Sequence, residues 1–236
     1  MREAGRLVAQ CHAALVERVK PGVSTRELDR FVEEFLKERG ATPSFKGYRG
    51  FPGSICVSVD DVICHGIPSR DRLRAGQVIT IDIGAHYKGY HGDSAWTYAV
   101  GEVSPEIQKL MDVTREALFA GIAAAQPGNR IGDIGHAIQS LAESHGYGVV
   151  RDFIGHGLGQ DLHEAPEVPH YGTPGTGFAL RPGMTIAIEP MITLGDYHVR
   201  VDADGWTART VDASICVQYE HTIAITDNGP EILTLP

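Results

Sequence analysis

The sequence contains few cysteines, few aromatic residues and no long apolar run. Its four cysteines form no Cys-x-x-Cys pair, so neither a disulfide framework nor a zinc knuckle is predicted. No segment approaches the roughly 18 consecutive apolar residues of a membrane span, and residues 1–6 open a helical pattern without the apolar core of a signal peptide. We therefore expect reduced thiols, a cytoplasmic location and no membrane contact.

The chain also lacks an excess of basic residues. Its formal net charge is −9 over 236 residues, which argues against nucleic acid or an anionic membrane as the main partner. The sequence is 42% hydrophobic and 22% charged, as in ordinary globular proteins. This length and composition can bury a sizeable core in one large domain or two small ones.

An internal repeat organises the sequence. Residues 74–82 (RAGQVITID) and residues 181–189 (RPGMTIAIE) share an arginine, a glycine two positions later, two alternate isoleucines and a final acid. The offset from Asp82 to Glu189 is 107 residues. We interpret this as a duplicated unit that delivers one carboxylate per half to a shared site.

The flanking segments repeat with nearly the same offset. A helix is expected over residues 1–20 and another over residues 107–125, each followed by Pro-Gly and a second helix ending at Gly40 or near Gly146. The pattern predicts an α+β fold with halves of about 1–106 and 107–236 related by a pseudo-twofold axis. Both would supply strands to a central antiparallel sheet with helices on its outer face. No low-complexity linker separates them, so we expect a single domain.

Polar residues recur between the two halves. The pairs are His65 with His163, Asp82 with Glu189, and Asp93 with Glu220. The second half adds His156, whose glycine neighbours permit close approach of a ligand. We expect these acids and histidines to converge at the pseudo-twofold axis.

Four ionised carboxylates cannot share a pocket without cations, because like charges a few Å apart raise each other's pKa. Two divalent metal ions would resolve this conflict. Oxygen-rich ligation with a single imidazole suits Mn²⁺, Fe²⁺, Co²⁺ or Zn²⁺. Two metals about 3.5–4 Å apart activate water and stabilise an oxyanion, so the pattern predicts a hydrolase.

At these residues the sequence resembles the methionine aminopeptidases of type I, which have the "pita-bread" metallopeptidase fold, in their short bacterial form. The resemblance covers nearly the whole chain in the family's order. The matching blocks are residues 64–68 (CHGIP), 81–82 (ID), 91–93 (HGD), 155–159 (GHGLG), 162–164 (LHE), 188–191 (IEPM) and 218–222 (QYEHT).

The resemblance implies a role for each residue. The implied metal ligands are Asp82, Asp93, His156, Glu189 and Glu220, with Asp93 and Glu220 bridging two ions. It also implies that Glu189 shuttles a proton, that His65 contacts the substrate amine, and that His163 hydrogen-bonds the scissile carbonyl or its oxyanion. The implied pocket for the methionine side chain is lined by Tyr48, Phe51, Cys56 and Trp206; core packing is the alternative explanation for these four.

The resemblance implies removal of the N-terminal methionine from nascent proteins and peptides, with a small second residue preferred. The expected partners are nascent polypeptide N-termini, with the ribosome as a candidate, and the expected state is a monomer. An Xaa-Pro aminopeptidase or dipeptidase of the same fold is one alternative, although such enzymes usually carry an additional N-terminal domain. A non-catalytic peptide-binding module is another, although such modules have typically lost metal ligands.

Overall fold

The computed structural model describes residues 1–236. In the first half the elements are α1 (Arg2–Leu15), α2 (Thr25–Glu38), β1 (Thr42–Pro43), η1 (Tyr48–Gly50), β2 (Cys56–Val59), β3 (Val62–Cys64), β4 (Val78–Tyr87) and β5 (Tyr90–Ala99). In the second half they are α3 (Pro105–Ala124), α4 (Ile131–Ser144), β6 (Gly148–Val149), β7 (Gly155–Gly157), β8 (Glu164–Val168), β9 (Thr185–Ile188), β10 (Met191–Thr193), β11 (Val199–Val201), β12 (Ala208–Thr210), β13 (Cys216–Gln218), β14 (His221–Thr226) and β15 (Gly229–Ile232).

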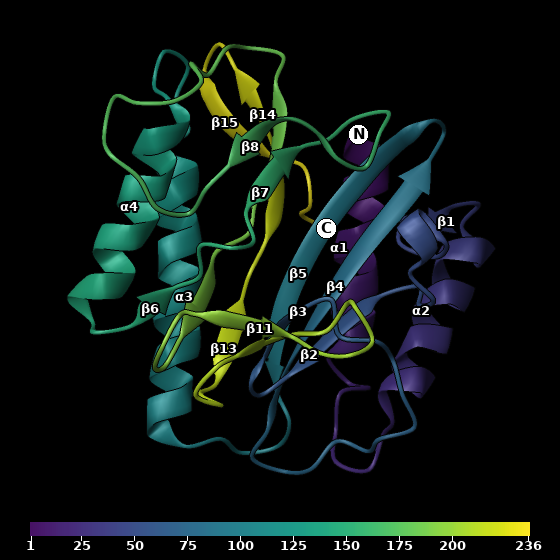
Figure 1. The fold of residues 1–236 in the computed structure, drawn as a ribbon. Coiled ribbons are helices and arrows are strands. Elements are labelled where there is room, and N and C mark those ends of the chain that lie inside the picture. The colour runs from purple at the N-terminus through teal and green to yellow at the C-terminus, as the bar shows by residue number, and fades with distance from the viewer.

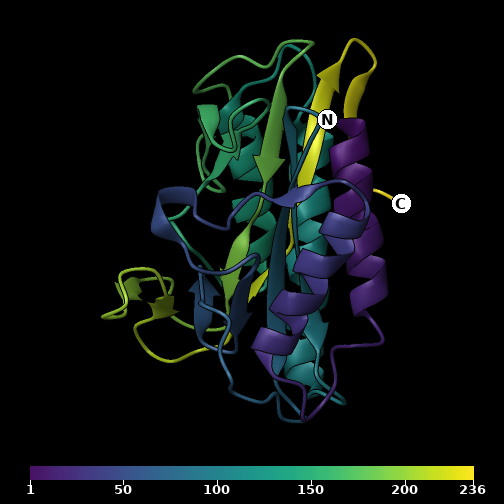
Figure 2. The same ribbon diagram turned by 90° about the vertical axis from the view of Figure 1, so that its right-hand side faces the viewer.

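The helices lie on one face of the strands. In Figure 1, α1 and α2 lie beside and behind the long β4–β5 hairpin, while α3 and α4 cover the other half of the molecule. In Figure 2, the purple helices lie to the right of the strands and the segment around residue 200 lies to the left. No helix is long and apolar enough to cross a membrane.

The helix boundaries follow local chemistry. The helix expected over residues 1–20 is shorter: α1 ends at Leu15 and a turn follows at residues 16–18, ahead of Pro21. Ser24 caps α2: its side chain accepts a hydrogen bond from the Glu27 backbone N–H, and the Glu27 carboxylate accepts one from the Ser24 N–H. Pro105 occupies the first turn of α3, where its missing N–H has no cost.

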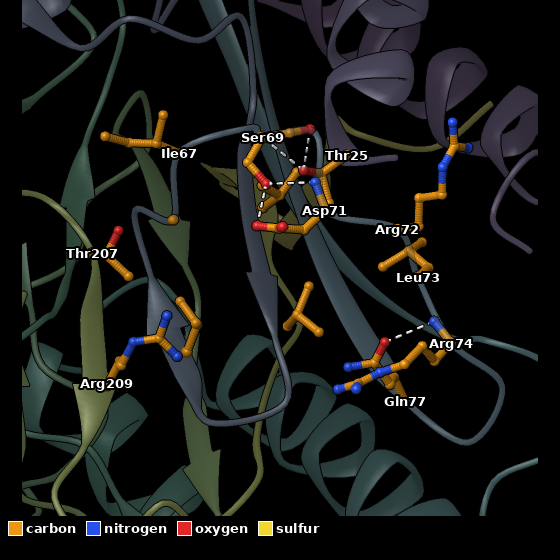
Figure 3. Close-up of a pocket in the computed structure, with 14 residues that line it drawn as sticks. Thr25, Ile67, Ser69, Asp71, Arg72, Leu73, Arg74, Gln77, Thr207 and Arg209 are labelled. Atoms are coloured by element: carbon orange, nitrogen blue, oxygen red, sulfur yellow. Dashed lines mark hydrogen bonds between the residues drawn. The ribbon is translucent and has the colours of Figure 1, made fainter. Parts of the chain in front are cut away.

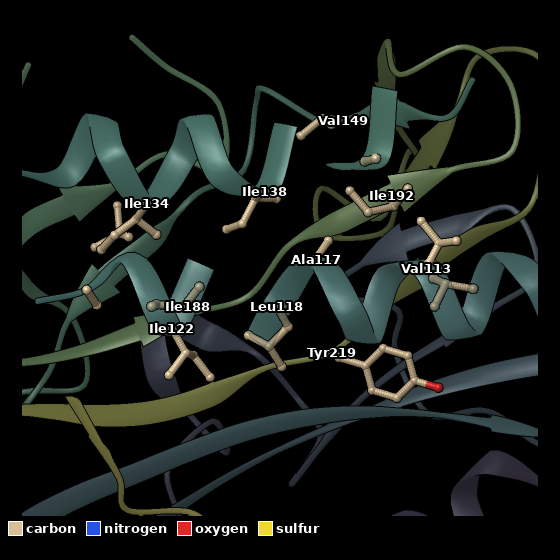
Figure 4. Close-up of a cluster of buried hydrophobic side chains, with 14 of the residues drawn as sticks. Val113, Ala117, Leu118, Ile122, Ile134, Ile138, Val149, Ile188, Ile192 and Tyr219 are labelled. Atoms are coloured by element: carbon tan, nitrogen blue, oxygen red, sulfur yellow. The ribbon is translucent and has the colours of Figure 1, made fainter. Parts of the chain in front are cut away.

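Each half has its own buried core. In the first half, α1 and α2 pack against β4, whose Ile79, Ile81 and Ile83 are fully buried. In the second half, α3 and α4 pack on the strands through a larger cluster, part of which Figure 4 shows. Labelled members of this cluster include Leu118, Ile134, Ile138, Ile188 and Ile192. The two cores lie on either side of the line where the halves meet.

The strands form two principal antiparallel sheets instead of one continuous central sheet. The first contains β1, β4 and β2, with β5 paired to β4, and the second has the order β15-β14-β9-β7-β8. Two three-stranded sheets, β13-β10-β6 and β11-β12-β3, complete the layer. The predicted α+β class and the placement of the helices are confirmed, but ladder pairing is interrupted between β5 and β13–β14.

Two threonines connect the halves across this interruption. Thr222 Oγ1 accepts a hydrogen bond from the Asp93 N–H at 3.0 Å and donates one to the Asp93 carbonyl at 2.7 Å. Thr97 Oγ1 does the same for the Gln218 N–H, at 3.2 Å, and the Gln218 carbonyl, at 2.7 Å. One threonine of each half thus satisfies both backbone groups of a residue in the other. This reciprocity is consistent with the predicted pseudo-twofold relation.

Candidate active site

Strand alternation places two carboxylates of the first half on one face. Ile81 and Ile83 of β4 point into the core, so Asp82 between them points to the opposite face. Across the hairpin, Asp82 pairs with Ala95 and Gly84 pairs with Asp93. Asp82 and Asp93 are therefore diagonal neighbours on the same face, close enough for their side chains to interact.

The second half supplies three further residues at strand ends. His156 lies in β7, Glu189 directly follows β9, and Glu220 lies between β13 and β14. The register of β9 and β14 pairs Ile188 with His221, which places Glu189 and Glu220 near each other. Potential metal-ligand atoms of Asp93, His156 and Glu220 lie within 4.8 Å of one another. The structure thus brings ligand-type side chains from both halves together.

The carboxylates of this cluster are poorly solvated. Asp93 and Glu220 are only 3% and 2% exposed. Burial raises the pKa of Asp93 to about 7. Burial, reinforced by the neighbouring Asp93 carboxylate, raises the pKa of Asp82 and of Glu220 well above the ordinary range. Without a cation, ionisation of all these groups would be strongly unfavourable.

Unsatisfied oxygen atoms indicate what the cluster can bind. Asp82 Oδ1, Asp93 Oδ1 and Glu220 Oε1 are buried and have no hydrogen-bond partner. Buried polar atoms are rarely left unpaired, so three such oxygens in one cluster fit a site for divalent cations. His156 is oriented for the same purpose: its Nδ1 lies 2.9 Å from the Gly157 carbonyl, so Nδ1 carries the proton and Nε2 can coordinate a metal.

Glu189 is held from two directions. Its Oε2 accepts a hydrogen bond from Gln218 Nε2 at 3.1 Å, and its Oε1 lies 3.7 Å from His156 Nε2. Its backbone N–H donates to Nε2 of the buried His170 at 3.1 Å. Burial, followed by the charge of Asp93, raises the pKa of Glu189 well above its usual value. A carboxylate with this environment can accept a proton readily.

Two histidines border the cluster on different sides. His163 Nδ1 lies 2.8 Å from the Tyr48 hydroxyl, and its ring centroid is 4.1 Å from that of His156. The ring of His65 packs edge-on against Phe153 at 5.3 Å. Burial lowers the pKa of both His65 and His163 to about 4. Both imidazoles are therefore neutral at pH 7 and can donate one hydrogen bond each.

One cavity of about 280 Å³ joins all of these groups. All eleven residues named from the sequence line it: Tyr48, Phe51, Cys56, His65, Asp82, Asp93, His156, His163, Glu189, Trp206 and Glu220. Its apolar end is aromatic, and the Phe51 and Trp206 rings meet edge to face at 5.2 Å. Their individual roles in metal or substrate binding stay predictions.

Sequence reasoning missed several lining residues. Phe45, Phe153 and Leu162 also line the cavity, and Phe45 and Leu162 pack with Phe51 and Cys56 in one apolar cluster. Phe45 lies in the same irregular segment as Tyr48 and Phe51, so its aromatic character was an available signal. Gln218 directly precedes the Tyr-Glu pair, but its contact with Glu189 follows only from the tertiary structure.

Figure 3 shows a second cavity, of about 400 Å³, lined by other residues. Cys56 lines the first cavity, whereas its neighbour Val57 lines the second. The polar groups of the second cavity are paired locally, as with Ser69 Oγ and Asp71 Oδ2 at 2.7 Å. Arg209 is similarly paired with Asp61 at 2.7 Å. None of the eleven residues named from the sequence lines this second cavity.

Comparisons with known proteins agree with this geometry. Residues 1–227 match the family model described as metallopeptidase family M24. The chain belongs to metallopeptidase family M24. Methionine aminopeptidase 1 of Bacillus subtilis is 55% identical over 234 residues, which cover 99% of this chain and 94% of that protein. The family assignment and the buried, unpaired carboxylate oxygens together support the use of divalent metal by this M24 chain.

Solved structures of M24 relatives give the same picture. The crystal structure of methionine aminopeptidase from Rickettsia prowazekii superposes with a TM-score of 0.98 at 43% identity, covering 99% of this chain and 95% of that one. A prolidase from Pyrococcus horikoshii superposes with a TM-score of 0.80 at 26% identity, but only 60% of its chain is covered. The pita-bread fold expected from the sequence is confirmed.

Proposed function

We propose that this protein is a methionyl aminopeptidase that removes the N-terminal methionine from proteins and peptides by metal-dependent hydrolysis. The observation that carries the proposal is the single cavity in which an apolar aromatic end adjoins the carboxylate–histidine cluster. Similarity to methionine aminopeptidases over 94–95% of their length supports the same function.

We infer that the cluster holds two divalent ions. Asp82 would bind one ion, His156 and Glu189 the other, and Asp93 and Glu220 both. The proposed metals are Co²⁺, Mn²⁺, Fe²⁺ or Zn²⁺, because carboxylates with one imidazole suit all four. When bound, such ions lower the pKa of water and stabilise developing negative charge on oxygen.

The protein side chains would then carry the proton and the substrate. Glu189 would accept a proton from the attacking water at a carboxylate oxygen and deliver it to the leaving nitrogen, with Gln218 fixing its orientation. Nε2–H of neutral His163 would donate to the carbonyl oxygen as it becomes an oxyanion. In that tautomer Nδ1 would accept a hydrogen bond from the Tyr48 hydroxyl, which lies 2.8 Å away.

His65 would contact the substrate amine and assist protonation of the leaving group. It lies directly after β3 with a positive φ of 57°, a conformation that is uncommon outside glycine and costs free energy. The packing of its ring against Phe153 and Trp206 holds the side chain towards the cavity. Such a strained residue at the boundary of the ligand cluster is consistent with a role in catalysis.

The apolar end of the cavity would receive the methionine side chain. Tyr48, Phe51, Cys56 and Trp206 would line this pocket, together with Phe45. An unbranched, polarizable thioether packs well against aromatic rings. The free α-amine would lie next to the metal cluster, which restricts cleavage to the first residue.

Other functions of the same fold are less well supported. The prolidase from Pyrococcus horikoshii is only 26% identical to this chain, and 60% of its length is covered by the match. A non-catalytic peptide-binding module would not require buried, unpaired carboxylate oxygens at its centre. Methionine removal is therefore the preferred proposal.

A direct peptide assay tests the assignment. Purified protein supplied with Co²⁺ or Mn²⁺ should release methionine from a Met-Ala-Ser peptide and leave an Xaa-Pro peptide intact, as measured by mass spectrometry. Cleavage of only the Xaa-Pro peptide would contradict the proposal. If neither peptide is cleaved with Co²⁺, Mn²⁺, Fe²⁺ or Zn²⁺, the non-catalytic peptide-binding module would be favoured.

The metal assignment has its own test. Asp93→Ala and Glu220→Ala should each abolish turnover and lower the metal content measured by inductively coupled plasma mass spectrometry. Unchanged activity in either variant would refute its bridging role. Anomalous scattering at the metal edges, from crystals grown without added metal, would show the number and identity of the ions.

We further propose that the substrates are nascent polypeptide N-termini in the cytoplasm and that the protein acts as a monomer. The acidic net charge of −9 argues against direct binding of nucleic acid or of an anionic membrane. The ribosome, where such N-termini emerge, is the candidate macromolecular partner. Co-sedimentation with translating ribosomes and light scattering of the free protein would test these two points.

A further inference from the structure

We propose that Arg49 is a specificity-determining residue that reads the charge of substrate side chains beyond the second residue and favours acidic ones. This inference rests on the proposed aminopeptidase function, because it concerns the part of the peptide that leaves the cavity. Glutamate or aspartate at the third or fourth position should raise kcat/KM relative to lysine.

Arg49 lies at the mouth of the cavity, beside the catalytic groups. It is exposed, yet it is one of the residues that line the cavity. Its guanidinium carbon lies 5.3 Å from the centroid of the Tyr48 ring, and the Tyr48 hydroxyl contacts His163 at 2.8 Å. Tyr48 therefore lies between Arg49 and His163, the residue expected to contact the scissile carbonyl.

The charge of Arg49 is not neutralised by the protein. Arg49 forms no side-chain hydrogen bond and no ion pair within 4.0 Å, as the full set of polar contacts shows. The nearby Lys46 differs in this respect, because its Nζ lies 2.7 Å from a carboxylate oxygen of Glu33.

The backbone directs this arginine to the mouth. Arg49 has φ 48° and ψ 24° within η1, a left-handed conformation that residues other than glycine and asparagine rarely adopt. A long charged side chain in such a conformation is a local departure from backbone preference. We interpret the departure as serving the position of the guanidinium.

The cavity lining also includes an exposed charge of the opposite sign. Asp152 also lines the cavity and is exposed. It precedes Phe153, which packs against His65. Arg49 is thus linked through Tyr48 to His163, whereas Asp152 precedes Phe153, which packs against His65, and no ion pair joins the two charges. We expect a peptide whose first side chain fills the apolar end to pass these exposed lining residues as it leaves the cavity.

The solvent exposure of Arg49 sets the expected size of its effect on kcat/KM. Ion pairs between partly exposed charges contribute little, and an effect of about threefold in kcat/KM is reasonable for each substrate charge. Because the interaction is solvent-exposed, it should weaken as ionic strength rises. An interaction that is equal in the ground state and the transition state changes KM and leaves kcat unchanged.

The test uses two peptide series, Met-Ala-X-Ser-Leu and Met-Ala-Ser-X-Leu, with X as Asp, Ser or Lys. In the wild-type enzyme the ratio of kcat/KM for Asp over Lys should exceed one by several-fold at one or both positions. Arg49→Asn should bring the ratio near one, and Arg49→Lys should retain it. Asparagine is chosen because it tolerates the left-handed backbone; Arg49→Gln serves as a second neutral variant.

The matched control is Arg70→Gln. Arg70 is exposed, lies outside the cavity and carries the same charge, so this variant separates a local contact from a change in net charge. A ratio that persists in both neutral Arg49 variants, or that falls equally in Arg70→Gln, overturns the inference. Failure to cleave the neutral Ser peptides in the wild-type enzyme would instead overturn the proposed function.

Discussion

At the scale of single residues, His163 illustrates how a neighbour can set the donor properties of an imidazole. The Tyr48 hydroxyl lies 2.8 Å from Nδ1, which leaves Nε2–H free to face the cavity. The depressed pKa of about 4, caused first by burial, keeps the ring neutral across the physiological range. A neutral donor is what an oxyanion requires from a residue that must not bind metal itself.

Replacing His163 by alanine should separate catalysis from metal binding. We expect kcat to fall by roughly 10²–10³, as when one oxyanion-hole donor is lost, with metal content unchanged. Steady-state kinetics and metal analysis of the same preparation measure both quantities. Loss of metal in this variant would mean that His163 is a ligand.

Asp93 links the ligand cluster to the stability of the metal-free protein. Its pKa is raised to about 7, from an ordinary value of 3.8, chiefly by burial. A carboxyl with a raised folded-state pKa contributes stability below its unfolded pKa, and this contribution is lost as pH rises through the folded pKa. The metal-free protein should therefore become less stable between about pH 4 and pH 7.

Asp93→Asn should remove this part of the pH dependence. At pH 7 the metal-free variant should melt about 2–4 °C higher than the metal-free wild type, which corresponds to about 1 kcal/mol. Added divalent metal should stabilise the wild type and have little effect on the variant. Differential scanning calorimetry with and without chelator measures both effects, and a metal-free variant that melts lower at pH 7 would contradict this account.

At the scale of elements, the contact between β4 and the segment at residues 44–45 shapes the substrate cavity. A Cβ atom on Gly84 would lie 2.7 Å from Ser44 Cβ and 2.8 Å from Phe45 Cε1. Gly84 pairs with Asp93 across the hairpin. The absence of a side chain at this position thus lets an aromatic wall of the cavity pack directly beside a ligand residue.

Gly84→Ala should displace Phe45 and weaken substrate binding. Overpacking of this kind costs about 1–3 kcal/mol in unfolding free energy, and KM for methionyl peptides should rise while metal content is retained. A second substitution, Phe45→Leu, should restore part of the lost stability, because it makes room for the added methyl group. If the double variant is no more stable than Gly84→Ala, the steric explanation is wrong.

The element scale is also where the sequence was most informative. The repeat at residues 74–82 predicted a buried strand that carries Asp82, and β4 is that strand, although it continues past Asp82 to Tyr87. The capping residues of α2 and α3 were equally readable, since these hydrogen bonds join residues three apart. The prediction that the first helix continues to residue 20 was wrong: α1 ends at Leu15, and Val19 is buried from the non-helical segment that follows.

Contacts between distant segments were not readable in the same way. Gln218 binds Glu189 across 29 residues, and Thr97 binds Gln218 across 121. Neither pair has a periodic pattern or a turn signal that would join its members. The interruption between β5 and β13–β14 was missed for this reason, because threonine side chains and a single backbone bond, from Glu220 N–H to the Ala95 carbonyl, take the place of a regular ladder there. Phe45 and Leu162 were missed because apolar residues have many uses in a core.

At the scale of the whole molecule, the two halves are joined by a shared sheet, in which β3 pairs with β12, and by buried hydrogen bonds. Thr97 and Thr222 each satisfy a backbone N–H and a carbonyl of the opposite half. All four residues in these contacts are buried. We predict that the halves, residues 1–106 and 107–236, unfold together as one domain.

Thr97→Val or Thr222→Val should test this dependence. Valine keeps the shape but leaves a buried N–H and carbonyl without partners, at about 1–3 kcal/mol for each group. The matched control, Thr226→Val, removes a bond from Thr226 Oγ1 to Gly229 within one surface hairpin and should cost less. Urea unfolding followed by fluorescence and circular dichroism should show one coincident transition; two separate transitions would contradict the single-domain prediction.

The division of the ligands between the halves has a consequence for biosynthesis. Asp82 and Asp93 are translated early, but Glu220 follows Asp82 by 138 residues. A growing chain would therefore hold only part of the proposed ligand set through most of its synthesis, and the remaining proposed ligands are added with the second half. Peptidase activity should therefore begin only when both halves have folded together. Truncated translation products should have no peptidase activity.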